Sequence, residues 1–445
     1  MLVNAALNWD QIQREATDIL SRYIRLDTSN PPGGESKAVE FLARLLAGDG
    51  IESRTYQSAP GRENLVARLR SSDTQSPPLL LLHHMDVVAA NPQLWSKPPF
   101  DGLIRDGHVW GRGAIDDKGL GAIHLMAMLL LKRAAVPLKR DLIFMAVADE
   151  EEGGSLGTRW MLDNQPAEVQ CEYVWDEGGV GSVGITGNRP VFTISVQEKR
   201  SVVVRLKAYG RGGHGSVASG GPLDRLVRAL HGIQGFAGDV RFNSVTRRFL
   251  EQLAETQTSL AGWIMRHPEA PISGSILKRQ LRKIPALDAM LRDTVTVTVV
   301  QAGVNSNVAP DEAEAVLDVR LLPDTPLENF LQRLNRAIND ESIEVTATDS
   351  PPSPPPSSTD TAMFQAMRRA VLTQVPEALV ASMQTPVATD SRFFRERGIN
   401  AYGLIPVVLT PEELGSIHGV DERISVQGLV QGIKIALDVL WDMCA

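Results

Sequence analysis

Five short motifs carry side chains that could bind metal ions or move protons. Their sequences are HHMD at 83–86, GRGAIDDKG at 111–119, ADEEEGGS at 148–155, VWDEGG at 174–179 and GSIHGVDE at 415–422. The candidate ligands in these motifs are His84, Asp116, Glu150 or Glu151, Asp176 or Glu177, and His418. Imidazole and carboxylate ligands without a thiolate suit zinc, cobalt or manganese. Such a set is enough for two metals about 3.5–4 Å apart, with one carboxylate bridging and another left as a base.

His84 and Asp86 follow the apolar run Leu79–Leu82. Residues two apart in a strand point to the same face, so we expect Asp86 to lie beside the imidazole of His84. A carboxylate there fixes the tautomer that a metal-binding histidine needs. His83 is expected on the opposite face and is the weaker ligand candidate. A polar strand end with no metal is the alternative interpretation of this pair.

The acidic motifs each have a structural alternative. Asp116 could enter a cleft from its glycine-flanked loop, or Asp116 or Asp117 could cap the helix predicted over Leu120–Lys132. The four acids Asp149–Glu152 directly follow the apolar strand predicted over Leu142–Ala148. Their mutual repulsion is costly near a buried strand unless a cation compensates it, and a solvated acidic turn is the alternative.

The elements around these motifs predict an α/β fold. Apolar strands that do not alternate are separated by helical patterns, which is typical of a mostly parallel sheet with helices on both faces, a three-layer domain. The expected strands are Leu79–Leu82, Leu142–Ala148 and Tyr173–Trp175, and the expected helices are Asp10–Leu26, Ala38–Ala47, Leu120–Lys132, Thr361–Leu372 and Val426–Trp441. The ends of parallel strands open on one edge of a sheet, where the five motifs would converge.

The middle of the chain has a different pattern. Its strands alternate between apolar and polar residues, which indicates an antiparallel sheet with helices on one face, an α+β module. Its expected elements are the strands Arg200–Lys207, Thr294–Val300, Ala313–Leu321 and Ile343–Thr348 and the helix Leu327–Ile338. A proline-rich connector with little ability to pack follows at Ser350–Ser358. The predicted domains are therefore 1–198 with 354–445, and an inserted domain over 199–353.

Net charge, cysteine count and the length of the apolar runs exclude several classes of protein. The chain has 445 residues and a formal net charge of −8, which argues against a nucleic-acid partner or a general anionic-membrane binder. Two cysteines cannot form a disulfide framework. No apolar run approaches the ~20 residues of a membrane-spanning helix, and the first residues lack a secretory pattern. We therefore expect a soluble, cytoplasmic protein.

The ordered motifs resemble the di-zinc peptidase family that includes aminoacylase, carboxypeptidase S, succinyl-diaminopimelate desuccinylase and carnosinase. The resemblance spans nearly the whole chain and is strongest to the carboxypeptidase S branch, in HMDVV at 84–88, in Trp95 with PFDG at 99–102, and in VWGRGAIDDKG at 109–119. It implies a zinc-exopeptidase-like catalytic domain and an inserted ferredoxin-like lid or dimerisation domain. It also implies a non-proline cis peptide after Asp116.

The resemblance also implies a role for each matching residue. His84 and Glu177 would hold one metal, Glu151 and His418 would hold the other, Asp116 would bridge, Asp86 would support His84, and Glu150 would be the general base. The spacing Asp-Glu-Glu-x-Gly resolves the register among the three glutamates, and Asp-Glu-Gly selects Glu177 over Asp176. The cofactor would be two divalent ions, with zinc favoured over cobalt or manganese.

In the inserted domain, the resemblance implies that His214 stabilises the developing oxyanion in the active site of a partner subunit, within a homodimer. Asn307, Arg320 and Arg392 match positions that contact substrate. The expected activity is hydrolysis of an amide in an N-acyl amino acid or short peptide with a free carboxylate. The alternatives are a dipeptidase or carboxypeptidase of the same family, and an inactive metal-binding interaction protein.

Two features depart from the family pattern. The family commonly has glycine where this chain has His83. An imidazole there could change the packing behind the site or act as a spurious ligand. The helical, basic segment 245–291 is longer than a minimal inserted domain and resembles an extension of the carboxypeptidase S branch. We expect it to shape substrate access or dimer contacts.

Overall fold

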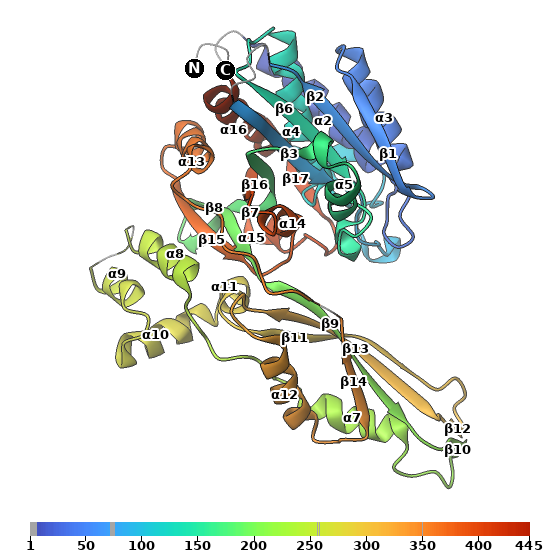
Figure 1. Ribbon diagram of the computed structural model, residues 1–445. Coiled ribbons are helices and arrows are strands. Elements are labelled where there is room, and N and C mark those ends of the chain that lie inside the picture. Colours follow the sequence, from blue (N-terminus) through green and yellow to red (C-terminus); the bar gives the residue numbers. More distant parts are fainter. Residues whose placement is uncertain (1–6, 72–75, 256, 258, 349) are drawn as a thin grey trace.

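The computed structural model describes residues 7–71, 76–255, 257, 259–348 and 350–445. Figure 1 shows a large α/β body that carries both chain termini and a smaller, elongated body below it. The two bodies are built on separate sheets of eight and four strands. The predicted fold class, a mostly parallel sheet with helices plus an inserted α+β unit, is confirmed.

The large sheet has the strand order β1-β2-β6-β3-β7-β16-β8-β15. Its strands are β1 (Ser53–Ala59), β2 (Arg62–Leu69), β3 (Ser76–His84), β6 (Arg140–Val147), β7 (Tyr173–Thr186), β8 (Arg189–Glu198), β15 (Leu379–Thr385) and β16 (Asn400–Leu409). The central strands β6, β3, β7 and β16 run parallel, whereas β2 pairs antiparallel with β6 and β1 pairs antiparallel with β2. The carboxyl ends of the four central strands therefore lie along one edge of the sheet, as the motifs require.

Helices cover both faces of this sheet. One face carries α2 (Trp9–Ile24), α3 (Ser36–Gly48), α4 (Lys118–Arg133), α13 (Ala362–Gln374) and α16 (Val426–Cys444), and the other carries α5 (Thr158–Asn164), α6 (Pro166–Val169) and α14 (Ser391–Arg395). The burial of β3 on both of its faces explains the uninterrupted apolar run Leu79–Leu82. Leu79 and Leu81 enter one core while Leu80 and Leu82 enter the other. A strand buried on both faces has no polar side to alternate with.

The small sheet has the order β11-β13-β9-β14, and every pair is antiparallel. Its strands are β9 (Arg200–Tyr209), β11 (Thr294–Ala302), β13 (Glu312–Leu321) and β14 (Ile343–Ala347), and its helices are α7 (Pro222–Gly232) and α12 (Leu327–Ile338). Alternate residues of β9 and β13 form one core with these two helices. At the far end of this body, β10 (Gly213–His214) pairs with β12 (Val308–Ala309) (Figure 1).

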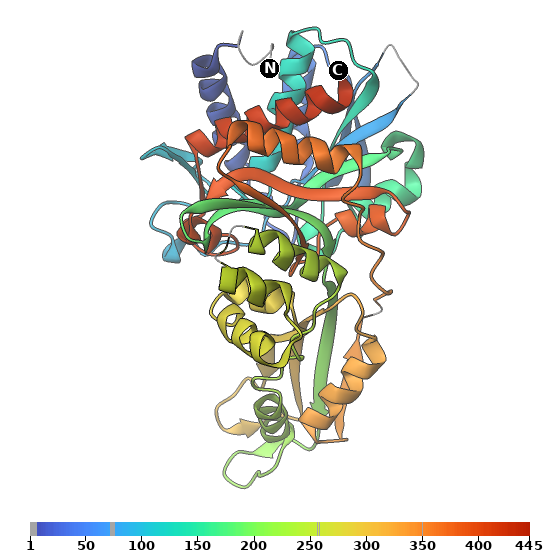
Figure 2. The ribbon, with the colours of Figure 1, turned by 90° about the vertical axis from the view of Figure 1, so that its left-hand side faces the viewer.

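The predicted helical extension folds as α8 (Ser244–Ala254), α9 (Ser259–Arg266), α10 (Pro271–Leu281) and α11 (Pro285–Met290). Although it lies between α7 and β11 in sequence, it packs on the large sheet. Its core includes Val191 of β8 with Leu379 and Ala381 of β15. Figure 2 shows these helices beneath the edge of the large sheet. Among the described residues, no helix is long and apolar enough to cross a membrane.

The proline-rich connector differs from the prediction at its end. Ser357 is buried, its backbone N–H donates to the Val196 carbonyl at 2.9 Å, and its hydroxyl donates to the Ala401 carbonyl at 2.8 Å. The expectation of little packing is therefore wrong for this residue, because its hydroxyl meets a buried carbonyl of β16. In the large sheet, the sequence analysis also missed the strands β1, β2, β8, β15 and β16.

Candidate metal centre

The predicted ligands come together at the carboxyl edge of the large sheet. His84 is the last residue of β3, Glu177 lies within β7, and Glu151 lies in the short helix η2 (Glu150–Glu152) after β6. Asp116 precedes α4, and His418 lies in the loop between α15 (Pro411–Leu414) and β17 (Arg423–Ser425). His84 and His418, although distant in sequence, both contact Asp116, because the end of β3 and the loop after α15 lie at the same edge of the large sheet.

These side chains form two groups that share Asp116. One group is His84, Asp116 and Glu177, and the other is Asp116, Glu151 and His418. Within each group the candidate ligand atoms lie within 4.8 Å of one another. The two oxygens of Asp116 are divided between the imidazoles, with Oδ1 3.0 Å from Nε2 of His84 and Oδ2 3.1 Å from Nε2 of His418. A carboxylate in this position has the geometry of a ligand that bridges two cations.

The remaining carboxylates complete each group. Oε2 of Glu151 lies 3.2 Å from Nε2 of His418, and Oε1 of Glu177 lies 3.9 Å from Nε2 of His84. Burial raises the pKa of Glu177 well above its ordinary value, and the nearby charges of Asp116 and Glu150 raise it further. Crowded buried carboxylates of this kind are stabilised by cations. The donor set therefore fits divalent metal ions.

Asp86 connects His84 to the short helix η2 (Glu150–Glu152), which we call the glutamate turn. Its carboxylate is fully buried and accepts hydrogen bonds from the backbone N–H groups of Glu150 and Glu151, each at 3.2 Å. Nδ1 of His84 lies 2.9 Å from the backbone carbonyl oxygen of Asp86 and 3.6 Å from its carboxylate. Asp86 therefore fixes the second nitrogen of His84 and the backbone of the turn together.

Glu150 lies beside this cluster. Burial is the main reason that its pKa is raised well above the ordinary value, and the charges of Asp390 and Glu151 add to the effect while His84 opposes it. A carboxyl group in such surroundings accepts a proton more readily than an exposed glutamate. This property suits a general base.

Glu422 is a buried residue to which the sequence analysis gave no role. Its carboxylate accepts hydrogen bonds from the backbone N–H groups of Gly113 at 3.1 Å, Ile115 at 2.8 Å and Asp116 at 3.1 Å. It also pairs with the guanidinium of Arg112 at 2.6 Å. Glu422 therefore anchors the loop that presents Asp116, next to the predicted cis peptide between Asp116 and Asp117, which is present.

Arg112 also contacts the loop that carries His418. Its Nη2 donates to the carbonyl oxygen of Gly419, the residue after His418, at 2.7 Å. One ion pair thus ties together the loops that carry Asp116 and His418. Both Arg112 and Glu422 lie inside the quoted motifs, but no local pattern in the sequence indicates that they pair with each other.

A second buried network supports the glutamate turn. Arg62 of β2 pairs with Glu35 at 2.8 Å and with Asp149 at 3.0 Å. Asn30 donates through Nδ2 to Asp86 at 2.8 Å and to Asp149 at 3.3 Å. Sequence reasoning missed Asn30 and Arg62 in this role, because their partners lie far away along the chain.

His83 faces away from the cluster, as predicted. Its Nε2 lies 3.1 Å from the hydroxyl of Tyr23, and its ring centroid lies 5.1 Å from that of Phe144. A Cβ added to Gly121 would lie 2.3 Å from the His83 ring, so glycine is required opposite it. Burial lowers the pKa of His83, which keeps the imidazole neutral. Of the two expectations for this residue, the structure supports altered packing.

Arg392 is the one predicted substrate contact that lies near the cluster. It is the second residue of the short helix α14, and its guanidinium donates to the carbonyl oxygens of Gly153 at 2.8 Å and Thr389 at 3.1 Å. Gly153 directly follows the glutamate turn. Arg320 lies on β13 of the small sheet, where it pairs with Asp318 at 2.9 Å.

His214 and Asn307 lie together at the far end of the small sheet, away from the cluster (Figure 1). The backbone N–H of Gly215 donates to the Asn307 carbonyl at 2.8 Å, and both His214 and Asn307 are exposed. Nδ1 of His214 lies 2.7 Å from the hydroxyl of Ser216. Within one chain, the structure does not bring these two residues to the metal ligands.

Comparisons with known proteins agree with the sequence motifs. Residues 80–442 match the model of peptidase family M20/M25/M40. Human N-fatty-acyl-amino acid synthase/hydrolase PM20D1 is 31% identical over 84% of this chain and 75% of its own length. A probable carboxypeptidase S-like protein of Dictyostelium discoideum is 28% identical over 83% of this chain and 72% of its own.

Solved structures have the same fold. Human carnosine dipeptidase 1 superposes with a TM-score of 0.72 at 15% identity, covering 100% of this chain and 99% of the other. The YXEP protein of Bacillus subtilis, described as a dinuclear metal-binding peptidase, gives a TM-score of 0.56 at 15% identity and covers 97% of this chain and 99% of the other.

Proposed function

Because the chain belongs to peptidase family M20/M25/M40, we propose that it is a metal-dependent hydrolase that cleaves an amide bond in N-acyl amino acids or short peptides with a free carboxylate. The observation that carries this proposal is the position of Asp116 between His84 and His418, with the carboxyl groups of Glu151 and Glu177 beside them. An inactive interaction protein would have no need to retain this complete set.

The proposed ligands follow the two groups. His84 and Glu177 would hold one divalent ion, Glu151 and His418 would hold the other, and Asp116 would contribute to both. We propose zinc, with cobalt and manganese as alternatives, because nitrogen and oxygen donors suit all three. Bound ions of this kind polarise a carbonyl group and lower the pKa of water.

Glu150 is the proposed general base. Its carboxylate takes the proton from the attacking water and passes it to the nitrogen of the leaving amine. The raised pKa that burial gives it supports the first transfer, because a carboxylate with a raised pKa is a stronger base than an exposed glutamate. Asp86 contributes as a positioning residue, since it holds His84 and the backbone of Glu150.

The substrate carboxylate is proposed to bind arginine. Arg392 lies beside the glutamate turn, where a guanidinium can receive a carboxylate through paired hydrogen bonds. Arg320 lies on the small sheet and Asn307 lies in the loop before β12, so both would contact substrate only across a subunit or domain interface. The proposed domains are 1–198 with 354–445 as the catalytic domain and 199–353 as the lid.

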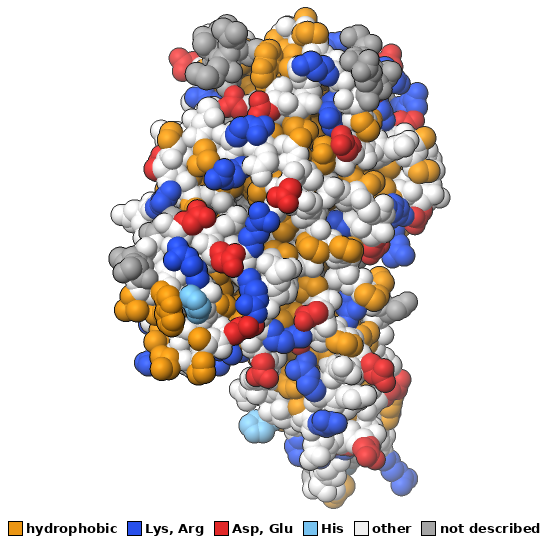
Figure 3. All heavy atoms as spheres, turned by 60° about the vertical axis from the view of Figure 1, so that its left-hand side comes forward, with side chains coloured by type: hydrophobic (Ala, Val, Ile, Leu, Met, Phe, Trp, Pro, Cys, Tyr) orange, Lys and Arg blue, Asp and Glu red, His pale blue; other side chains and the backbone are white. Residues whose placement is uncertain are grey.

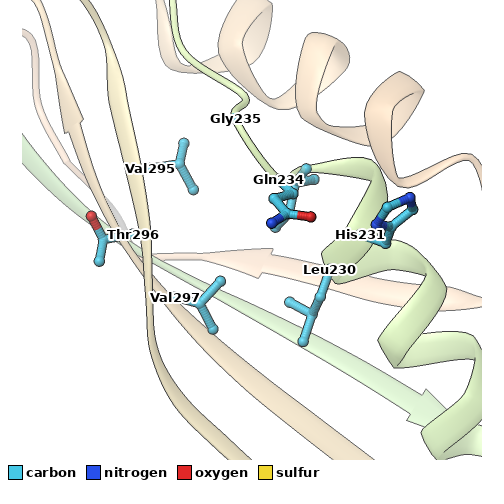
Figure 4. Close-up of a pocket in the computed structure, with 8 residues that line it drawn as sticks. Leu230, His231, Gln234, Gly235, Val295, Thr296 and Val297 are labelled. Atoms are coloured by element: carbon cyan, nitrogen blue, oxygen red, sulfur yellow. The ribbon is translucent and has the colours of Figure 1, made fainter.

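We further propose a homodimer that forms through the small sheet, in which His214 reaches the site of the partner. Strand β11 is an edge strand and exposes Val297, Val299 and Val300. Figure 4 shows Val295 and Val297 facing a hollow that also contains Leu230 and His231 of α7. An edge strand that exposes valines beside a hollow is suited to self-association about a two-fold axis. A cytoplasmic location is part of the proposal, supported by the two free, buried cysteines.

A substrate panel tests the function. The purified protein is assayed with N-acyl amino acids, with their carboxamide analogues and with unblocked dipeptides, with added zinc or manganese. We expect release of free amino acid from the N-acyl amino acids and little from the carboxamides, because the free carboxylate is required. Faster turnover of dipeptides would make the protein a dipeptidase, and hydrolysis of none of the three classes would contradict the proposal.

A further inference from the structure

Helices α9 and α10 present large apolar side chains to solvent. Leu260 and Trp263 of α9 are 70% and 48% exposed, and Ile272 and Ile276 of α10 are 78% and 43% exposed. Spacings of three and four residues place each pair on one face of its helix. Figure 3 shows hydrophobic side chains gathered over this part of the molecule, with Lys and Arg side chains beside them. We call these four residues the apolar stripe.

The stripe is not an incomplete core. The opposite face of α10 is already packed, because Leu277 and Leu281 are buried in the core that includes Phe249 and Leu250 of α8. Burying side chains of this size stabilises a protein by roughly 1.5–3 kcal/mol each. A stripe left outside a filled core therefore indicates a surface that meets another apolar phase.

The charge around the stripe is strongly positive. Residues 259–283 contain five basic side chains and one acidic side chain, a net charge of +4 in a chain whose net charge is −8. The basic residues are Arg266, Lys278, Arg279, Arg282 and Lys283. The acid, Glu269, already pairs with Arg247. On α10, Ile272, Ile276 and Arg279 follow one another at helical spacing, and Lys283 lies two residues after the end of the helix, so basic side chains follow the apolar stripe along the chain.

Exposed apolar side chains next to basic side chains indicate the kind of partner that this surface binds. A helix with apolar residues and tryptophan on one face and Lys or Arg at its margin binds in the interfacial plane of a bilayer. Anionic headgroups supply the opposite charge, and the acyl region supplies the apolar phase. A second copy docking through the same surface would bring +4 against +4 across the two-fold axis, which is unfavourable.

We propose that the α9–α10 surface binds anionic lipid bilayers peripherally, with Leu260, Trp263, Ile272 and Ile276 inserted among the headgroups and the five basic residues around them. This proposal does not depend on the hydrolase assignment, because none of these residues belongs to the metal centre. It locates one face of the protein on a membrane without any spanning segment.

Vesicle cosedimentation of the full chain tests the proposal. The vesicles are phosphatidylcholine alone, or phosphatidylcholine mixed with phosphatidylglycerol, each at low and high salt. We expect binding to the anionic vesicles to be at least roughly tenfold stronger, and to weaken with salt. Equal binding to both vesicle types, or binding to neither, would overturn the proposal.

Two double variants locate the surface. Trp263→Ser with Ile272→Ser removes apolar contact, and Arg279→Glu with Lys283→Glu reverses charge. Each is expected to lower vesicle binding at least roughly tenfold while basal hydrolysis of a soluble substrate stays unchanged. Leu94→Ser is the matched control, because Leu94 is 67% exposed but lies on the short helix η1 (Pro92–Leu94).

The control is expected to bind vesicles like the unaltered protein. If it loses as much binding as the double variants, the α9–α10 surface is not the site. Light scattering of the same proteins without lipid tests the other occupant. If the apolar double variant changes the oligomeric state and leaves vesicle binding unaltered, the stripe is a contact between copies of the chain, and the proposal is wrong.

Discussion

The metal centre and the tip of the small sheet are built by opposite means. Around Asp116, buried charges are held by several hydrogen bonds each, from Glu422 on one side and Asp86 on the other. At the tip, His214 and Asn307 are exposed and are carried by a pair of two-residue strands. A site whose geometry is complete within one chain needs such a buried scaffold. A residue that acts by approaching another site needs exposure and reach instead.

The largest effect is expected at the metal centre. Glu150→Gln removes the proposed base but leaves every ligand, so turnover should fall by about 10²–10⁴-fold while metal content is unchanged. Glu151→Gln removes a ligand and should lower metal content. Metal analysis together with a hydrolysis assay on each purified variant distinguishes the two roles. The reverse pattern would shift the assignment by one residue.

The next largest effect on turnover is expected at His214, at the tip of the small sheet. His214→Ala should lower turnover by about 10²–10³-fold, as for the loss of one oxyanion donor, with normal metal content. Because the proposed His214 acts in the partner's site, mixing this variant with Glu150→Ala should restore activity after subunit exchange. Each mixed dimer then has one site without either substitution.

The complementation also tests the comparison between the two regions. A mixture that stays inactive although exchange is demonstrated would mean that His214 acts within its own chain or has no catalytic part. Full activity of His214→Ala alone would remove the tip from the mechanism.

A smaller effect is expected at Glu422. Glu422→Ala removes the anchor of the Asp116 loop and should weaken metal binding by roughly 10–100-fold, the usual scale for residues that support ligands. Asp293→Asn is a matched control, because Asp293 is a buried carboxylate that accepts from the Leu322 N–H at 2.9 Å in the other body. The control should lower the melting temperature without changing metal affinity, measured by competition with a chelator. Equal losses of affinity in both would show a general effect of destabilisation.

The smallest effect is expected where the two sheets join, at Lys199. Burial is the main cause that lowers its pKa to about 7, and its Nζ donates to the Ala289 carbonyl and the Thr294 hydroxyl, each at 3.0 Å. The unfolded chain binds this proton up to about pH 10.4, so the free energy of unfolding should rise between about pH 7 and 10, by at most about 1.4 kcal/mol per pH unit. Lys118, also with a pKa of about 7, contributes a similar slope.

Urea unfolding at several pH values measures this slope. Lys199→Met should reduce it and leave the part due to Lys118. An unchanged slope in the variant would mean that Lys199 keeps its proton in the folded state throughout this range.

The mostly parallel sheet and the clustering of the candidate motifs at its edge could be predicted from local patterns, whereas the choice of Glu151 and Glu177 among neighbouring acids rested on the family resemblance. Leu79–Leu82 is apolar at every position since both faces of β3 are buried, and the ligand-bearing motifs follow such strands directly. The supporting network was not predictable in this way. Arg112 and Glu422 are 310 positions apart, and no local pattern joins them.

The packing partner of the helical extension was also hidden. The sequence of α8–α11 indicates helices with a buried face, but not that this face meets β15 of the large sheet. Likewise, β1 lacks an apolar pattern because the residues Ser53–Ala59 are half-buried or exposed at a sheet edge. Periodicity tells which side of an element is buried and leaves its neighbour undetermined.

The most direct measurement is a titration of activity against metal content. Protein stripped with a chelator and reconstituted stepwise with zinc, cobalt or manganese is assayed for release of free amino acid from an N-acyl amino acid. Activity should vanish on stripping and return to its full value at two ions per chain, one for each of the two ligand groups around Asp116. Full activity in protein that contains no divalent transition metal would contradict the proposed mechanism.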